Sequence, residues 1–536
     1  MSIHIKTPRS IVAHTTGAAG HRESGANRIT ATPPTTSGTN VASSPAPLRA
    51  QTQTHSGGKT LMSIGQLAIL TVVAVASLRS LPAMADYGLA SVLLYLIPAV
   101  FFLVPTALVS AELATGWKGG VYVWVREAFG NRAGFVAIWL QWIQNVVWYP
   151  IQISFIAVSL SYVFGSGSLG NNGVYVAVVI IVLYWISTLV ALRGGNLFAK
   201  VGSICGLIGT LLPAALLIIL GIVWLCAGEP MHTSLHASAL LPPWTGISSI
   251  VLIVSNVLAY AGMEVNAVHA NDMKDPGREF PRATVLSTVL ILLVLVLPTL
   301  SIAFAVPHRE LGLIDGINLA FKEFFDHFGM DWGVPVISLL IALGAFSSVI
   351  TWIAGPSRGL LAAARTGLMP PMLQKRNAAG VQEGILLAQG VIVTILALLF
   401  VLIPNGNTAF ATLVDMATAL YLMMYMMMFA AAIRLRISHP EVVRTYRVPA
   451  LNWIAGIGFV AAAAAFVLAF VRPAGFSGMS SLGYALLVAL VVAVLGVPPL
   501  IMYALRRTGW DLRSDQEKHD GTGILVNPPR QAEEAR

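Results

Sequence analysis

The chain contains 536 residues, of which 56% are hydrophobic and 10% are charged, and its formal net charge is +9. Its apolar runs are longer than a soluble core helix needs, so the composition excludes a soluble protein and indicates an all-α protein that crosses the lipid bilayer many times. The basic residues fall in short loops between these runs and form no single basic face, so we expect no nucleic-acid partner.

Residues 1–58 precede the first apolar run and differ from the rest of the chain. They are rich in Thr, Ser, Ala, Pro and Gly, contain Glu23 as their only acid, and show no apolar periodicity. A segment of this composition cannot bury enough surface to fold, so we expect a disordered tail without a signal-peptide core. A transit peptide is one alternative. We favour a dispensable tail or an upstream start-site artefact, because Met62 stands where the first apolar run begins.

Twelve apolar runs follow this tail, and each is long enough to cross a bilayer as an α-helix. They occupy about residues 61–86, 88–115, 131–163, 173–192, 197–226, 247–272, 281–306, 334–364, 383–403, 408–433, 452–471 and 481–505. We therefore predict a membrane domain of twelve transmembrane helices at 59–505 and a C-terminal tail at 506–536. The acidic connection between the seventh and eighth runs is expected to form a short surface helix.

The loops on the two sides of this predicted bundle differ in positive charge. Those after the second, fourth, sixth, eighth and tenth runs hold 16 Lys and Arg residues, whereas the opposite loops hold 3. Positive charge marks the cytoplasmic side of a membrane protein. We therefore expect a plasma-membrane protein with both termini in the cytoplasm and the acidic connection outside.

The first apolar run contains Arg79 and Pro82 in mid-span. Pro82 lacks a backbone N–H and would clash with the preceding turn of a continuous helix, so the helix is expected to bend or break there. Arg79 is unfavourable at this depth unless it faces a cavity. Taken alone, Pro82 indicates no more than an ordinary kink.

The sixth run carries a second irregularity. Tyr260, Ala261 and Gly262 lie where this helix would cross the middle of the bilayer, and Glu264 follows them. A carboxylate at this depth costs about 3 kcal/mol even on lenient insertion scales, so it should face a protein interior or a water-filled cavity. Irregular backbone is tolerated only beside such a cavity. We therefore expect an interrupted helix next to one polar site.

The two interruptions lie five spans apart. Broken hydrophobic segments at corresponding positions in two halves of a chain are typical of secondary transporters built from inverted repeats, whose substrate site lies between the broken helices. The pairing therefore favours a transporter domain at 59–505 over an isolated kink.

Three blocks of sequence resemble one transporter family. They are SAELATGWKGGVYVWVREAFG at Ser110–Gly130, AYAGMEVNAVHANDMKDPGREFPRA at Ala259–Ala283 and WIAGPSRG at Trp352–Gly359. Together they resemble the amino acid–polyamine–organocation transporters, and most of all the branch that contains the bacterial glutamate/γ-aminobutyrate antiporters. The resemblance covers about residues 61–505. It implies a five-plus-five inverted repeat, two accessory helices, and alternating access around the first and sixth helices.

This resemblance and the broken helices together predict how a substrate is held. Half-helices at a break present N–H groups to a carboxylate and carbonyls to an ammonium group, so an α-amino acid is bound largely by backbone. In the first helix we expect these contacts to come from Ala76, Ser77, Arg79 and Ser80. In the sixth helix we expect them to come from Asn256, Tyr260, Ala261 and Gly262.

Aromatic side chains on two other helices are predicted to line the substrate path. Tyr421 and Tyr425 lie four residues apart, and therefore on one face of the tenth helix. The pair matches two tyrosines of the antiporter branch, and Trp352 matches a tryptophan of the same branch. The alternative for all three is core packing, which is the common role of aromatic residues at helical spacing.

Polar groups on the second and third helices leave more than one role open. Gln141, Asn145 and Trp148 share a stripe on the third helix, where they face either the path or a neighbouring helix. Glu112 and Arg126 flank GWKGGVYVW, which matches a cytoplasmic loop of the family. The resemblance gives these two residues a gating or structural ion-pair role.

Coupling to H⁺ or Na⁺ has two sets of candidate residues. Glu264 is the candidate for proton coupling or gating. Ser347 and Ser348 lie on the eighth helix, where sodium-coupled relatives of this architecture supply hydroxyl ligands to a cation, and the antiporter branch has a glutamate at the position of Ser348. Small residues for close helix packing are the alternative reading of both serines.

Neither a cofactor nor enzyme chemistry is predicted. His269 lies five residues after Glu264, which is no metal-ligand spacing on a helix, and no HExxH pattern occurs, so we expect no metal site. Cys205 and Cys226 are separated by about 31 Å along one predicted helix, which is too far for a disulfide. The TGILVNPP segment resembles only the start of the antiporter branch's C-terminal plug, so closure of the path by this tail is not expected.

Arg79 departs from the antiporter branch, which has a tyrosine there. A guanidinium at the first break can bind the second carboxylate of an acidic amino acid or pair with Glu264. Because an unpaired buried charge costs several kcal/mol, we expect the pair to form without substrate if the two groups come within reach, and protonation of Glu264 to free Arg79. In the other interpretation, Arg79 points to a vestibule and orients the first helix.

These observations predict an amino acid exchanger or proton-coupled carrier that favours acidic substrates. Within transport, the alternative is a carrier of neutral or cationic amino acids or of polyamines. The alternative of another class is a transporter-fold nutrient sensor that binds an amino acid without moving it.

Overall fold

The computed structural model describes residues 62–193, 196–242, 244, 246–266, 273–403, 405–473 and 480–512. Three expectations fall outside these residues: the disordered tail at 1–58, the end of the sixth run at 267–272, and most of the C-terminal tail with its TGILVNPP segment. The described residues form helices and no extended strand, which confirms the all-α class.

Most predicted spans are helices whose ends lie close to the predicted bounds. The single-helix spans are α6 (Asn131–Val163), α7 (Gly173–Leu192), α8 (Asn196–Ala227), α11 (Pro276–Ala305), α13 (Gly333–Ala363), α16 (Gly406–Ser438) and α17 (Leu451–Leu468). The ninth and twelfth spans are the pairs α14 (Glu383–Ala397) with α15 (Leu399–Leu402), and α18 (Ser481–Gly496) with α19 (Pro498–Leu505). The acidic connection contains the expected short helix, α12 (Gly316–His327).

The first span is broken in its middle. α1 (Ile64–Val75) ends where Ala76 and Ser77 adopt extended backbone conformations. A short 3₁₀ turn, η1 (Leu78–Ser80), then leads into α2 (Leu81–Ala85). The axes of the two half-helices differ in direction by 51°. The backbone between them therefore leaves the helical hydrogen-bond pattern at membrane depth.

Prolines mark the ends of helical segments in the first two spans. Pro82 lies in the first turn of α2, where a helix needs no backbone N–H, so it begins a half-helix and does not kink a continuous one. In the second span, Pro98 is the last residue of one helical segment and Pro105 lies in the first turn of the next, on either side of a π-helical stretch. That span consists of η2 (Gly88–Ala90), α3 (Ser91–Pro98), η3 (Ala99–Leu103) and α4 (Val104–Gly116).

The sixth span is also broken, between α9 (Ile253–Tyr260) and α10 (Met263–Asn266). Ala261 is extended, and Gly262 has φ of 109°, a conformation that glycine adopts far more readily than other residues. A Cβ atom at Gly262 would lie 3.4 Å from the ring of Trp352. The interruption thus occupies two residues at the end of the predicted range 256–262.

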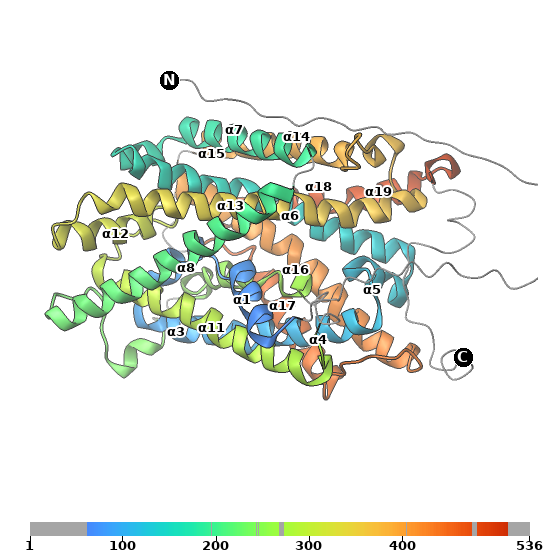
Figure 1. Ribbon diagram of the computed structural model, residues 1–536, viewed down its shortest axis with the longest axis horizontal. Coiled ribbons are helices and arrows are strands. Elements are labelled where there is room, and N and C mark those ends of the chain that lie inside the picture. The colour runs from blue at the N-terminus through green and yellow to red at the C-terminus, as the bar shows by residue number, and fades with distance from the viewer. Residues whose placement is uncertain are drawn as a thin grey trace, which may run out of the picture. The chain divides into compact units, whose positions relative to one another are not determined.

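The broken spans lie within a bundle of long helices. α13 packs against α6 and α8, and α16 packs against α6, α17 and α5 (Gly120–Phe129). In the view of Figure 1, α7 and α14 lie along one edge, α3, α4 and α11 lie along the opposite edge, and α6, α13 and α16 lie between them. The helices that carry the predicted polar site therefore run through the middle of the bundle.

Ten helices in the described residues are long and apolar enough to cross a membrane, and the bent pair at the first break makes eleven. The sixth span contributes a shorter apolar segment, Ile253–Val265, because its continuation lies outside the described residues. A multi-spanning helical membrane protein is therefore confirmed, whereas the count of twelve and the inverted repeat stay predictions.

Candidate functional site

Two small cavities lie beside the first break, and they share Ser77, Arg79, Trp148 and Trp352. The first has a volume of about 60 Å³ and is lined by Val75, Ser77, Arg79, Gln144, Asn145, Trp148, Leu258, Ala259, Ala261, Trp352 and Tyr421. The second has a volume of about 40 Å³ and is also lined by Ala76, Gln152, Thr210 and Ser348. Volumes of this size hold a few water molecules, so a larger ligand requires the cavities to widen.

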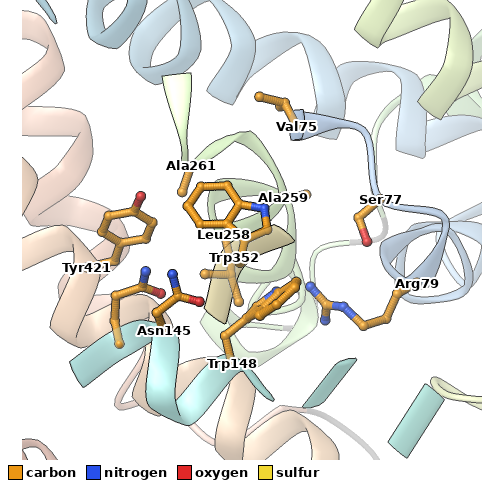
Figure 2. A pocket seen from close by; sticks show the side chains of 11 residues that line it. Val75, Ser77, Arg79, Asn145, Trp148, Leu258, Ala259, Ala261, Trp352 and Tyr421 are labelled. Atoms are coloured by element: carbon orange, nitrogen blue, oxygen red, sulfur yellow. The ribbon is translucent and has the colours of Figure 1, made fainter. Parts of the chain in front are cut away.

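Arg79 enters the first cavity as a buried cation, with 2% of its surface exposed. Its Cζ atom lies 5.6 Å from the ring centroid of Phe410, and Figure 2 shows its guanidinium pointing toward Trp148. Nε and Nη1 have no hydrogen-bond partner in the described part of the chain. A buried cation with unused donors is unfavourable unless an acceptor approaches it, so its position suits an anionic ligand.

Asn145 of α6 brings a second unused donor to the same cavity. Its side chain is buried, and its Nδ2 atom has no hydrogen-bond partner within the described residues. In Figure 2 its amide points into the cavity from the wall opposite Arg79. The cavity therefore lies between a guanidinium and an amide donor, an arrangement that two carboxylate groups of one ligand could satisfy.

Aromatic side chains form the remaining walls. The rings of Trp148 and Trp352 have centroids 6.4 Å apart, and Tyr421 closes the side next to Asn145. Trp352 and Tyr421 therefore lie at the cavity, and their contact with a substrate stays a prediction. Tyr425, one turn later, does not line either cavity and instead stacks edge-on against Phe102 at 5.1 Å.

The second break is held by a hydrogen-bond network around Glu264, which is 2% exposed. The Tyr421 hydroxyl donates to Oε1 at 2.5 Å, the Tyr425 hydroxyl donates to Oε2, and Gln141 Nε2 donates to Oε1 at 3.0 Å. The backbone N–H of Gly262 donates to the Tyr425 hydroxyl at 2.8 Å. The network therefore satisfies the carboxylate and ties α6 and α16 to the break.

The expected pairing of Arg79 with Glu264 is not present. Three donors from α6 and α16 surround the carboxylate, while two guanidinium nitrogens of Arg79 have no acceptor among the described residues. The physical reason is that hydroxyl and amide donors already compensate the buried carboxylate. Release of Arg79 by protonation of Glu264 is therefore not needed.

Besides Tyr425, four predicted substrate contacts do not line either cavity: Ser80, Asn256, Tyr260 and Gly262, whose N–H donates to Tyr425. Asn256 lies inside α9, where its Nδ2 donates to the Leu94 carbonyl at 3.2 Å. The Tyr260 hydroxyl donates to the Tyr95 carbonyl at 3.0 Å, and the Ser80 hydroxyl bonds within its own turn. These donors bond to neighbouring backbone, whereas Oδ1 of Asn256 has no partner among the described residues, and a substrate role for these residues stays a prediction.

The two serines of α13 face different surroundings. Ser348 lines the second cavity together with Arg79, and its hydroxyl lies 3.5 Å from the Gly344 carbonyl. Ser347 packs against α8, because a Cβ at Gly206 would lie 2.8 Å from its hydroxyl oxygen. Only Ser348 therefore reaches the region of the first break.

Glu112 joins an ion-pair cluster away from the cavities. It accepts a hydrogen bond from Arg436 Nε at 2.8 Å, and Arg444 Nε lies 3.6 Å away. Burial lowers the pKa of Arg444, and the charge of Glu112 opposes this shift. Arg126 pairs with its neighbour Glu127 instead. The cluster joins the end of α4 to the end of α16, and a gating or a structural ion-pair role for Glu112 stays a prediction.

Sequence reasoning missed three polar residues of the cavities: Gln144, Gln152 and Thr210, which lies on α8. Gln144 lines the first cavity, and Gln152 lines the second with an Oε1 atom that has no partner in the described region. Gln152 continues the helical stripe of Asn145 and Trp148 after one more turn, so the spacing alone would have found it. Gln144 lies beside this stripe and carries no comparable signal.

Comparison with known proteins identifies relatives along most of the chain. The amino acid permease family model matches residues 62–494. An uncharacterized transporter of Legionella pneumophila is 41% identical over 421 residues, which cover 77% of this chain and 90% of that protein. A glutamate/γ-aminobutyrate antiporter of Lactococcus lactis is 32% identical over 446 residues, which cover 81% of this chain and 89% of the antiporter.

A more distant relative is named for a different class of substrate. A probable agmatine/putrescine antiporter of Lactococcus lactis is 27% identical over 395 residues, which cover 71% of this chain and 81% of that protein. Relatives of this fold therefore include proteins named for acidic and for cationic substrates. The choice between acidic and cationic substrates for this chain therefore depends on the side chains that line the cavities.

Proposed function

The chain belongs to the amino acid permease family, and from this premise we propose that it exchanges acidic amino acids across the plasma membrane. Amino acid transport itself follows from the family. The observation that carries the choice of substrate is Arg79, a buried cation at the first helix break with two nitrogens that have no acceptor among the residues that the structure describes. The glutamate/γ-aminobutyrate antiporters among the relatives are consistent with this choice.

Electrostatics supports an anionic ligand at Arg79. Leaving a guanidinium buried without an acceptor costs several kcal/mol, and a carboxylate placed on its fork of donors recovers much of this energy. Asn145 supplies a further donor across the cavity. A substrate with a carboxylate on its side chain as well as on its α-carbon would satisfy both groups, whereas a neutral amino acid would satisfy only one.

The same charge disfavours the alternative substrates. A polyamine or a cationic amino acid would bring a second positive charge next to Arg79 in a cavity with little solvent to screen it. Such a ligand needs an unpaired carboxylate, but the carboxylate of Glu264 is already bonded to Tyr421, Tyr425 and Gln141. Cationic transport is therefore the weaker proposal for this chain.

Glu264 is proposed to gate the path rather than to compete for Arg79. Tyr425 donates to Glu264 and accepts the N–H of Gly262, so the carboxylate, the hydroxyl and the second break act as one unit. Protonation of the carboxylate would remove an acceptor from this unit and loosen the break from α16. Glu264 would then couple proton binding to the movement that exposes the cavity to either side.

Sodium coupling is not part of the proposal. Ser348 lines a cavity of about 40 Å³ with Arg79, so a sodium ion there would lie close to a fixed positive charge. The distribution of Lys and Arg in the loops, 16 against 3, supports cytoplasmic termini. We therefore propose a sodium-independent exchanger with both ends of the chain in the cytoplasm.

Exchange in proteoliposomes tests the proposal. The full chain is reconstituted with internal glutamate, and uptake of labelled glutamate, glutamine, γ-aminobutyrate and putrescine is measured at about pH 5 and about pH 7. The parent should prefer glutamate to glutamine. Arg79→Gln should lower the glutamate-to-glutamine ratio by about tenfold or more, because a hydrogen bond to a charged group contributes about 1.5–3 kcal/mol.

The matched control is Lys322→Gln, which removes an exposed positive charge from α12 outside the bundle. This variant should keep the parent ratio. An unchanged ratio in Arg79→Gln would contradict the role of Arg79 in selectivity. Binding of glutamate without flux would instead indicate a sensor.

A further inference from the structure

A second buried carboxyl lies on α16, away from the two cavities. Asp415 is 4% exposed and follows the start of α16 by nine residues, or about 14 Å of helical rise. The whole helix is about 50 Å long, and a hydrocarbon core of about 30 Å leaves about 10 Å beyond each side. The carboxyl therefore lies at the edge of the hydrocarbon core, on the side where α16 begins.

The group that contacts Asp415 comes from α18. The Tyr484 hydroxyl of α18 donates to Oδ2 of Asp415, and Tyr484 is 1% exposed. Hydroxyls next to Asp415 on α16 are used locally, since Thr412 and Thr418 bond to backbone carbonyls one turn earlier. Among the described residues, the carboxyl of Asp415 makes no ion pair. One neutral donor is a weak replacement for the solvation of an anion, whereas a neutral acid needs little more.

Among the described residues, no charged group on the elements around α16 makes an ion pair with Asp415, and the buried cation Arg79 contacts α16 at Phe410, five residues before Asp415. α9, α15, α17 and α18 contain no charged residue. Glu112 of α4 is bonded to Arg436, 21 residues after Asp415 along α16. On α5, Arg126 and Glu127 pair with each other, and Arg132 lies in the first turn of α6. The tyrosines of α16 itself donate to Glu264. Tyr484 is therefore the titratable side chain whose contact with Asp415 the structure records.

Asp415 and Glu264 thus differ in surroundings but share one helix. Glu264 accepts from three donors, and Asp415 accepts from a single phenol. Six residues separate Asp415 from Tyr421, which turns the two side chains to different faces of α16. Movement of α16 would therefore act on the Tyr484 contact and on the Glu264 network at the same time.

We propose that Asp415 is a proton-binding site of this transporter, which takes a proton from water on the side where α16 and α18 begin and releases it during the transport cycle. The carboxylate and one proton form the neutral acid, and release reverses this step without another reactant. This inference does not depend on an acidic substrate. The antiporter branch has a glutamate at the position of Ser348, and a serine cannot bind a proton in its place. In this chain we assign proton binding to the carboxyl at the α16–α18 contact.

Two measurements on the full chain in proteoliposomes test the site. Infrared difference spectra between acid and neutral pH should show a carboxylic-acid C=O band that is lost in Asp415→Asn and shifted in Tyr484→Phe. Substrate-driven proton movement, followed with an enclosed pH-sensitive dye, should fall clearly below the parent level in Asp415→Asn while substrate exchange continues. The control, Asp315→Asn, removes a carboxyl at the start of α12 and should leave both signals unchanged.

Retention of the band and of proton movement in Asp415→Asn would overturn the proposal and leave Asp415 as a static tie between two helices. If Asp415→Asn does not insert, Tyr484→Phe still decides the question. It keeps the carboxyl and removes its donor, so a band at the parent frequency in this variant would also overturn the proposal.

Discussion

The break between α1 and α2 leaves a buried cation with unused donors, whereas the break between α9 and α10 surrounds a buried carboxylate with three donors. Both ionised groups lie where water is scarce, and both are about 98% buried. Among the described residues, one break therefore has its buried charge satisfied by protein donors and the other does not. The satisfied break is suited to holding helices together, and the other is suited to binding a ligand.

The largest expected effect of this difference is that removing the charged group from one break stabilises the protein, whereas removing it from the other destabilises the protein. Arg79→Met should raise the free energy of unfolding of the substrate-free protein by about 2 kcal/mol, because an uncompensated buried charge is removed. Glu264→Met should lower it by about 3 kcal/mol, because Tyr421, Tyr425 and Gln141 lose their acceptor. Thermal unfolding in detergent without substrate shows whether each variant is more or less stable than the parent.

Glutamate should sharpen the same comparison. Added to the parent, it should raise the unfolding temperature, since a ligand that binds only the folded state stabilises it. Arg79→Met should lose most of this increase. If Arg79→Met is less stable than the parent without ligand, the guanidinium has a partner in the working protein and the contrast between the breaks is wrong.

The two tyrosines of α16 test the second break at a smaller scale. Tyr425→Phe removes a donor to Glu264 and the acceptor for the Gly262 N–H, while Tyr421→Phe removes only a donor. We expect a loss of about 2 kcal/mol in unfolding free energy for Tyr425→Phe and about 1 kcal/mol for Tyr421→Phe. Chemical unfolding of the two variants side by side measures the ranking.

Transport kinetics should also distinguish the Tyr421 and Tyr425 variants. Tyr421 lines the first cavity and Tyr425 does not. Tyr421→Phe should therefore change the Michaelis constant for substrate more than Tyr425→Phe does. Equal effects of both variants on stability and on this constant would show that the Gly262 N–H does not depend on Tyr425.

The fold was largely readable from the sequence because membrane spans follow from length and hydrophobicity. The expected bounds of 131–163 and 173–192 coincide with α6 and α7. The breaks were also readable, since Arg79 and Glu264 are unfavourable in an uninterrupted apolar helix. The role of Pro82 was not, because a proline kinks a helix or begins one according to where the preceding turn ends.

The partners of the charged groups were less predictable. The spacing predicted that Tyr421 and Tyr425 lie on one face of α16. Which helix this face contacts depends on tertiary packing, and in the structure both hydroxyls donate to Glu264. The same limit led to the expected Arg79–Glu264 pair, since opposite charge alone favours it. Asp415 carried the signal of a buried acid in a span, yet its donor, Tyr484, lies 69 residues later on α18.

The smallest expected effect concerns the serines beside the first break. Ser347→Ala with Ser348→Ala should leave glutamate exchange within about twofold of the parent, with sodium or with choline as the external cation. Ser347 packs against α8, and Ser348 shares its cavity with Arg79, whose charge opposes a bound cation. The same double variant in the Arg79→Gln background is the useful comparison, because the fixed positive charge of the guanidinium then no longer opposes a cation near Ser348. If exchange in the parent depends on sodium and the double variant abolishes this dependence, a cation site lies at the first break. Sodium, and not the substrate, would then complete the polar groups of that break.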